Sequence, residues 1–62
     1  MPTVQIELLT GRTVEQKREM AAKVTEAIVT SLNCPKEAVS IIIRDMPLEN
    51  YANAGVLRID KK

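Results

Sequence analysis

Hydrophobic and polar positions alternate at the start of the chain. Within residues 3–9, Val4, Ile6 and Leu8 are separated by polar residues. A period of two predicts a strand with one face buried and the other open to solvent. The alternation stops at residues 10–12, where Gly11 indicates a turn.

A helical pattern follows. Apolar residues then recur at steps of three and four: Met20, Val24, Ala27, Ile28 and Leu32. This spacing predicts an amphipathic helix over residues 14–32. Thr13 and Gln16 match a capping box, in which a threonine and the glutamine three residues later satisfy each other's backbone N–H groups. Asn33 favours the left-handed conformation that ends a helix, and Pro35 prevents its continuation.

The second half of the chain begins with a short turn at residues 35–37. Residues 39–43 then form a β-branched run with apolar side chains at both odd and even positions. Such a run predicts a strand that is buried on both faces and ends at residues 45–47. We interpret residues 48–55 as a loop, because Asn, Ala and Gly are frequent there, and residues 56–59 as a short strand.

A strand, a long helix and a second strand form a βαβ unit with parallel strands. The predicted fold class is α+β, as one domain over residues 1–62. A chain of about 60 residues buries little surface, and a two-stranded sheet alone is unstable. One cysteine and no histidine leave neither a disulfide nor a zinc site as a stabilising device. The helix covers only one sheet face, so the sequence predicts self-association.

Composition excludes several classes of function. The net charge is +1 and Tyr51 is the only aromatic residue, which argues against nucleic-acid binding. No apolar stretch approaches the roughly 20 residues that span a bilayer, so no membrane partner is expected. The N-terminus lacks the pattern of a signal peptide, and the lone cysteine suits a reducing compartment. We therefore expect a cytoplasmic protein.

The pair Met1-Pro2 is the most informative chemical feature. Removal of the initiator methionine would expose Pro2 as a secondary amine. An α-amino group has a pKa near 8, and an apolar pocket or nearby cations would lower it. A base with a pKa near the working pH suits proton transfer. The structural alternative is that Pro2 simply begins a strand, where its missing N–H does little harm.

Three other side chains are candidates, each with a plain structural alternative. Arg12 follows the first strand and can bind a carboxylate through two parallel hydrogen bonds. An arginine at such a position is, taken alone, more often a solvated loop cation. Tyr51 lies in the later loop and suits either a pocket wall or a subunit contact. Cys34 has no basic or histidine neighbour in the sequence, which favours an inert role.

Taken together, these features resemble one family. Pro2, the strand pattern of residues 4–9, residues 11–17, residues 46–51 and Gly55 occur in the order and spacing of the 4-oxalocrotonate tautomerase family. The resemblance covers essentially the whole chain. It implies a βαβ fold with a C-terminal hairpin, assembled as a homohexamer that is a trimer of dimers, with sites composed across subunits. No cofactor is implied, because enol–keto conversion needs only proton transfer.

The resemblance also implies roles for individual residues. Pro2 would be the general base, taking a proton from the 2-hydroxyl of a 2-hydroxymuconate-like dienol and returning one at carbon five. Arg12 would hold the distal carboxylate, and the Leu9 backbone N–H would also contact the substrate. Tyr51 stands where the best-known members carry phenylalanine in the pocket wall. The implied process is the catabolism of aromatic compounds.

Ser40 is the one marked departure from the family. It stands where the best-known members carry a second arginine at the substrate's 2-oxygen and adjacent carboxylate. Serine cannot neutralise developing enolate charge. Arg44, about 13 Å further along the strand at ~3.3 Å per residue, is too far away to replace it. Two alternatives therefore stay open: a dehalogenase, hydratase or decarboxylase of the same superfamily, and a non-catalytic assembly or binding subunit.

Overall fold

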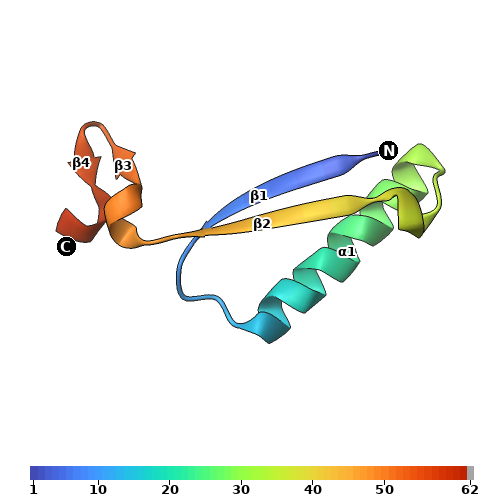
Figure 1. Cartoon of the computed structure of the whole chain (residues 1–62), viewed down its shortest axis with the longest axis horizontal. Helices are drawn as coiled ribbons and strands as arrows, with labels where there is room; N and C mark the ends of the chain where they lie inside the picture. Colours follow the sequence, from blue (N-terminus) through green and yellow to red (C-terminus); the bar gives the residue numbers. More distant parts are fainter. Residues whose placement is uncertain (62) are drawn as a thin grey trace.

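The computed structural model describes residues 1–61 and has an α+β fold. Strand β1 (Thr3–Leu9), helix α1 (Val14–Leu32) and strand β2 (Ser40–Met46) form the βαβ unit. A small antiparallel hairpin of β3 (Ala52–Asn53) and β4 (Val56–Leu57) follows it. Figure 1 shows the helix lying along one side of the β1–β2 ribbon, with the hairpin projecting beyond the end of the sheet. The predicted βαβ unit and C-terminal hairpin are confirmed.

The two long strands are parallel, with Thr3 opposite Ser40 and Leu9 opposite Met46. Side chains alternate along a strand, so in this register each face of the sheet carries every second residue of both strands. The helix-covered face carries Val4, Ile6, Leu8, Ile41, Ile43 and Asp45, and the other carries Thr3, Gln5, Glu7, Ser40, Ile42 and Arg44. The first strand therefore follows its predicted alternation.

The helix begins and ends where the sequence predicts. The Thr13 hydroxyl accepts a hydrogen bond from the Gln16 N–H at 3.1 Å, and the Gln16 side chain accepts one from the Thr13 N–H at 3.0 Å. Asn33 caps the other end in the left-handed conformation, with φ of 55°. Local sequence is sufficient here, because caps satisfy backbone groups with side chains only a few residues away.

The second half of the chain differs from its predicted boundaries. Strand β2 begins at Ser40 and continues through Met46, because the hydrogen-bonded partner β1 is seven residues long. The predicted loop over 48–55 contains a single-turn helix and strand β3, and the predicted strand 56–59 is only Val56–Leu57. Ala54 and Gly55 both have positive φ, as in the tight turns that suit hairpins.

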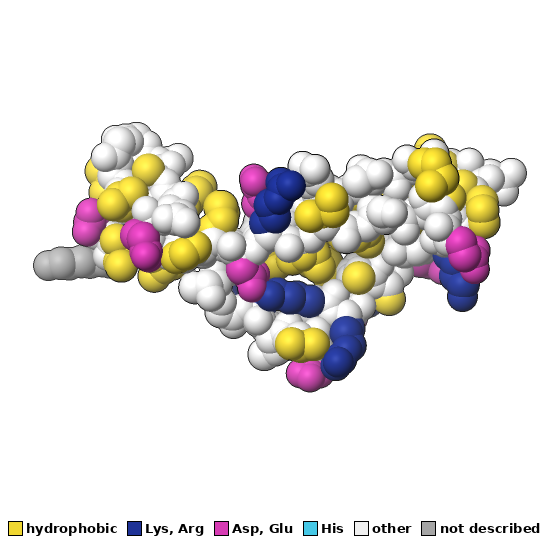
Figure 2. All heavy atoms as spheres, in the orientation of Figure 1, with side chains coloured by type: hydrophobic (Ala, Val, Ile, Leu, Met, Phe, Trp, Pro, Cys, Tyr) yellow, Lys and Arg dark blue, Asp and Glu magenta, His cyan; other side chains and the backbone are white. Residues whose placement is uncertain are grey.

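No side chain within residues 1–61 is fully buried in the single chain. Ile41 and Ile43 are half-buried under the helix, whereas Ile42 on the other face is 39% exposed. The prediction that this strand is buried on both faces is therefore wrong for one chain, because one helix covers one face. Figure 2 shows hydrophobic side chains open to solvent over the C-terminal segment, where Leu48, Tyr51, Val56, Leu57 and Ile59 are exposed. Within residues 1–61, no helix is both long enough and apolar enough to cross a membrane.

Candidate active site

Pro2 lies at the beginning of β1 and is half-buried. Its carbonyl oxygen accepts a hydrogen bond from the Ser40 N–H at 3.0 Å, which ties the start of β1 to the start of β2. Met1, immediately before it, is 97% exposed. Removing Met1 would therefore cost almost no packing and would leave the hydrogen bond between Ser40 and the Pro2 carbonyl oxygen in place.

Ser40 is brought to the same end of the sheet as Pro2. It lies opposite Thr3 in the register, and its side chain is exposed on the face that α1 leaves uncovered. On that face, Arg44 lies four residues further along β2 and donates a hydrogen bond to the Gln5 side chain at 3.5 Å. Gln5 lies two residues nearer to Pro2 than Glu7, the register partner of Arg44. The Arg44 guanidinium is therefore directed toward the end of the sheet that carries Pro2 and Ser40, and that it does not replace the missing arginine stays a prediction.

Leu9 and Arg12 lie at the opposite end. Leu9 is the last residue of β1, and the Thr10 N–H then donates to the Met46 carbonyl oxygen at 2.9 Å. Gly11, with φ of 121°, turns the chain toward the helix in a conformation that favours glycine. Arg12 is exposed, and within residues 1–61 no ion pair or side-chain hydrogen bond holds its guanidinium. Such a cation is available to bind an anion.

Tyr51 follows β2, beyond the same end of the sheet as Arg12. It joins the single-turn helix Leu48–Asn50 to β3, and its carbonyl oxygen accepts a hydrogen bond from the Arg58 N–H at 2.8 Å. Its side chain is 42% exposed. Tyr51 is the only aromatic residue of the chain. It belongs to the segment after β2, which projects beyond the end of the sheet (Figure 1).

The five candidate residues thus form two groups at opposite ends of the sheet. Pro2 and Ser40 lie at one end, and Leu9, Arg12 and Tyr51 lie at or beyond the other. The strand between them separates Pro2 from Thr10 by roughly 25 Å at ~3.3 Å per residue. A single chain therefore does not bring the candidate base and the candidate carboxylate anchor together.

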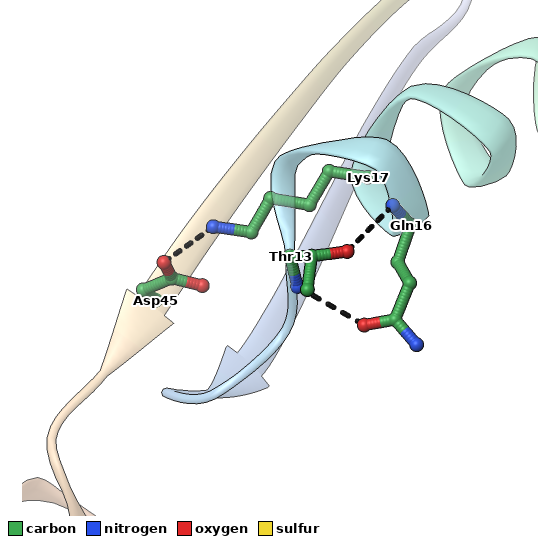
Figure 3. Close-up of polar contacts among 4 residues, drawn as sticks. All are labelled: Thr13, Gln16, Lys17 and Asp45. Carbon is green, nitrogen blue, oxygen red and sulfur yellow. Dashed lines mark hydrogen bonds and ion pairs between the residues drawn. The ribbon is translucent and has the colours of Figure 1, made fainter.

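One interaction near Arg12 was missed by the sequence analysis. Lys17 of α1 and Asp45 of β2 form an ion pair with 2.5 Å between Nζ and Oδ2 (Figure 3). The signal was present, because Asp45 has the parity of Ile41 and Ile43 and therefore lies on the helix-covered face. Within residues 1–61, no group of three or more acidic, cysteine or histidine side chains is placed to hold a metal ion.

Comparison with known proteins shows which family the chain belongs to. The family described as "Tautomerase enzyme" matches residues 2–60. A probable tautomerase of Streptococcus pneumoniae is 48% identical over 58 residues, which cover 94% of this chain and 97% of that protein.

Two solved structures show the same fold. A 4-oxalocrotonate tautomerase isozyme of Methylibium petroleiphilum is 41% identical, with a TM-score of 0.90 over 94% of this chain and 91% of that one. A heterohexamer 4-oxalocrotonate tautomerase of Chloroflexus aurantiacus is 27% identical, with a TM-score of 0.92 over 100% of both chains. The chain therefore belongs to the 4-oxalocrotonate tautomerase family of the tautomerase superfamily.

Proposed function

We propose that this chain is a tautomerase that interconverts the enol and keto forms of 2-hydroxymuconate-like 2-hydroxydienoates. The observation that carries the proposal is the position of Pro2, at the start of β1 and behind an almost fully exposed Met1. Membership of the tautomerase family supports the reaction class. We place the reaction in the cytoplasm and in the catabolism of aromatic compounds, in keeping with the unpaired Cys34 and the family resemblance.

The chemistry is a proton transfer that Pro2 can perform alone. Once Met1 is removed, the neutral secondary amine accepts the proton of the 2-hydroxyl group, and the electron pair moves through the diene. The protonated amine then returns a proton at carbon five, which leaves a ketone and restores the free base. Atoms and charge balance over the cycle, so no cofactor or co-reactant is required.

Three of the four proposed substrate contacts come from the other end of the sheet, and the fourth, Ser40, lies at the Pro2 end. Arg12 binds the distal carboxylate, with a fork of donors that matches the two carboxylate oxygens. The Leu9 backbone N–H donates to the substrate, and the Tyr51 ring covers the pocket wall. Ser40 offers one neutral hydrogen bond where a second arginine would supply a charge.

Because the two groups lie roughly 25 Å apart in one chain, we propose that the site is completed by a second subunit. Only the inner edge of β1 is paired, with β2, so its outer edge can pair with another strand. Antiparallel pairing of two β1 strands about a two-fold axis would place Pro2 of one chain beside Leu9 and Arg12 of the partner. We propose a homohexamer built from such dimers, which would also cover Ile42 and the exposed C-terminal hydrophobic side chains.

The test begins with the mass of the purified chain, which should lack one methionine. Ketonisation of 2-hydroxymuconate, followed by ultraviolet absorbance, should then be catalysed by this Met-free chain. Pro2→Ala should reduce kcat by about 10²- to 10⁴-fold, the usual contribution of a general base. Equal rates for the variant and the wild type would reject Pro2 as the base.

A second function is favoured by one specific observation, the serine at position 40. The similar Chloroflexus aurantiacus protein is a heterohexamer, so different chains of this fold can share one assembly. This chain would then be an assembly or binding subunit whose partner chain supplies the second arginine. Native mass spectrometry of the chain expressed alone discriminates: a stable homo-oligomer with a free Pro2 amine and no activity would support this second function.

A further inference from the structure

The segment that carries Arg12 is attached to β2 at both of its ends. At its start, the Thr10 N–H donates to the Met46 carbonyl oxygen at 2.9 Å. At its end, Lys17 lies one helical turn after Thr13, donates its N–H to the Thr13 carbonyl oxygen at 3.1 Å, and reaches Asp45 with its ammonium group. Asp45 and Met46 are adjacent in β2. The two attachments therefore hold the short connection between β1 and α1 against one point of the sheet, and Figure 3 shows the attachment through Lys17 and Asp45.

The Lys17–Asp45 pair differs from the other ion pairs within residues 1–61. Arg18 with Glu15 and Lys23 with Glu19 are pairs within α1, and their side chains are 71–77% exposed. The Lys17 and Asp45 side chains are 27% and 43% exposed, and they join the helix to the sheet. Partial burial reduces screening by solvent and salt, so this pair restrains its two elements more than an exposed pair would.

Lys17 and Arg12 also line the same cavity. Its volume is about 430 Å³, and Leu8 and Met20 contribute apolar wall. Lys23 and Glu19 line it as well and pair with each other at 3.4 Å. Unpaired cations that line one cavity repel each other. Asp45 both neutralises Lys17 and holds its ammonium group at β2, which leaves Arg12 as the cation free to meet an anion.

We propose that Lys17 and Asp45 are positioning residues that act through Arg12: the ion pair fixes the β1–α1 connection and directs the Arg12 guanidinium toward the substrate's distal carboxylate. This inference rests on the proposed function of Arg12. It assigns no contact between Lys17 or Asp45 and the substrate. The consequence is that the ion pair lowers the KM for dicarboxylates only while Arg12 is present.

The experiment compares two substrates in the Met-free oligomer, 2-hydroxymuconate with two carboxylates and phenylenolpyruvate with one. Lys17→Met and the nearly isosteric Asp45→Asn should each raise the KM for 2-hydroxymuconate about two- to fivefold, the range of a partly exposed ion pair. Neither variant should change kcat or the KM for phenylenolpyruvate. Lys17→Arg, which keeps the charge, should restore the wild-type KM. Arg18→Met removes an ion pair within the helix and is the matched control, with no change expected.

A double-mutant cycle tests whether the pair acts through Arg12. In an Arg12→Ala background, Asp45→Asn should cause no further rise in the KM for 2-hydroxymuconate. An additive rise would overturn the inference, since Lys17 or Asp45 would then act on the substrate independently. An effect of equal size on both substrates, or no effect from either variant while Arg12→Ala alone raises the KM, would overturn it as well. If Arg12→Ala itself leaves the dicarboxylate preference unchanged, the anchoring role of Arg12 in the proposed function fails and this inference fails with it.

Discussion

The two ends of strand β1 differ in the contacts that hold them and in the charge that they carry. At the beginning, Pro2 is held by one backbone hydrogen bond from Ser40 and has no charged residue beside it in either strand. At the other end, Arg12 follows Leu9 in a connection that is fixed by the Thr10 hydrogen bond, the capping box and the Lys17–Asp45 pair. One end carries the nitrogen that we propose as the base once Met1 is removed, and the other carries a charge suited to binding an anion.

This difference explains why a chain of 62 residues would depend on association for chemistry as well as for stability. The strand that holds both ends rigid also keeps them apart, because an extended backbone cannot fold back on itself. A base and an anchor on opposite ends of one strand meet only when a second strand runs in the opposite direction. In the proposed two-fold pairing, the end of one strand that carries Pro2 would lie beside the end of the partner strand that carries Arg12.

The largest expected effect tests this separation directly. At 2-hydroxymuconate concentrations well below the KM, where a raised KM lowers the rate, the Pro2→Ala and Arg12→Ala chains should each be weakly active alone. They should regain activity when they are unfolded together and reassembled. Random assortment in a symmetric oligomer gives about one quarter of the sites an intact Pro2 from one chain and an intact Arg12 from another. The rate should therefore return to about one quarter of the wild-type value. Mixing the two variants without unfolding is the control, and a reassembled mixture no faster than that control would place both residues in one chain's site.

A smaller effect is expected from the anchor end alone. Arg12→Ala removes a charge-assisted pair of hydrogen bonds to a carboxylate, which is worth about 1.5–3 kcal/mol. The KM for 2-hydroxymuconate should rise about 10- to 100-fold, with a much smaller change for phenylenolpyruvate. Steady-state kinetics on both substrates provide the measurement. A parallel loss on the monocarboxylate would mean that Arg12 acts on the reacting end of the substrate.

The pH profile shows whether the two ends meet. A protonated Pro2 amine cannot accept a proton, so kcat/KM should fall about tenfold per pH unit below the pKa of that amine. An arginine in the same pocket disfavours the protonated amine and lowers its pKa. Arg12→Ala should therefore raise the pKa of Pro2, and activity should be lost at a higher pH than in the wild type. The chain has no histidine to obscure this titration. An unchanged midpoint would indicate that Arg12 stays distant from Pro2 in the assembly.

The smallest expected effect concerns the structural support of the anchor end. Thr13→Ala removes the side-chain half of the capping box and should cost about 1 kcal/mol of unfolding free energy. Thr30→Ala is the matched control, because the Thr30 hydroxyl donates only to carbonyl groups of its own helix, those of Glu26 and Ala27. Its effect should be close to zero or slightly stabilising, since alanine has the higher helix propensity. Denaturant unfolding measures the unfolding free energy of both variants. Equal losses would show that the Thr13 cap does not stabilise the helix.

Several features could be predicted because their causes are local. The alternation of β1, the helix bounds Val14–Leu32 and the left-handed Asn33 cap all depend on residues within a few positions of one another. The first residue of β2 and the exact bounds of the two hairpin strands could not be predicted, since hydrogen-bonded partners decide where a strand begins and ends. Candidate site residues could be named from the family pattern, but their distribution over two ends of the sheet required the parallel register.

The amino-acid sequence by itself determined the order of the elements, the ends of the helix, the family and the position of a proline directly after Met1. The tertiary structure decided which residues are neighbours. It paired Lys17 with Asp45, placed Ser40 beside Pro2 and left Ile42 exposed on an uncovered face. The physical reason is that caps and periodicity act over a few residues, whereas contacts between β1, α1 and β2 depend on a sheet register that joins positions far apart in the chain.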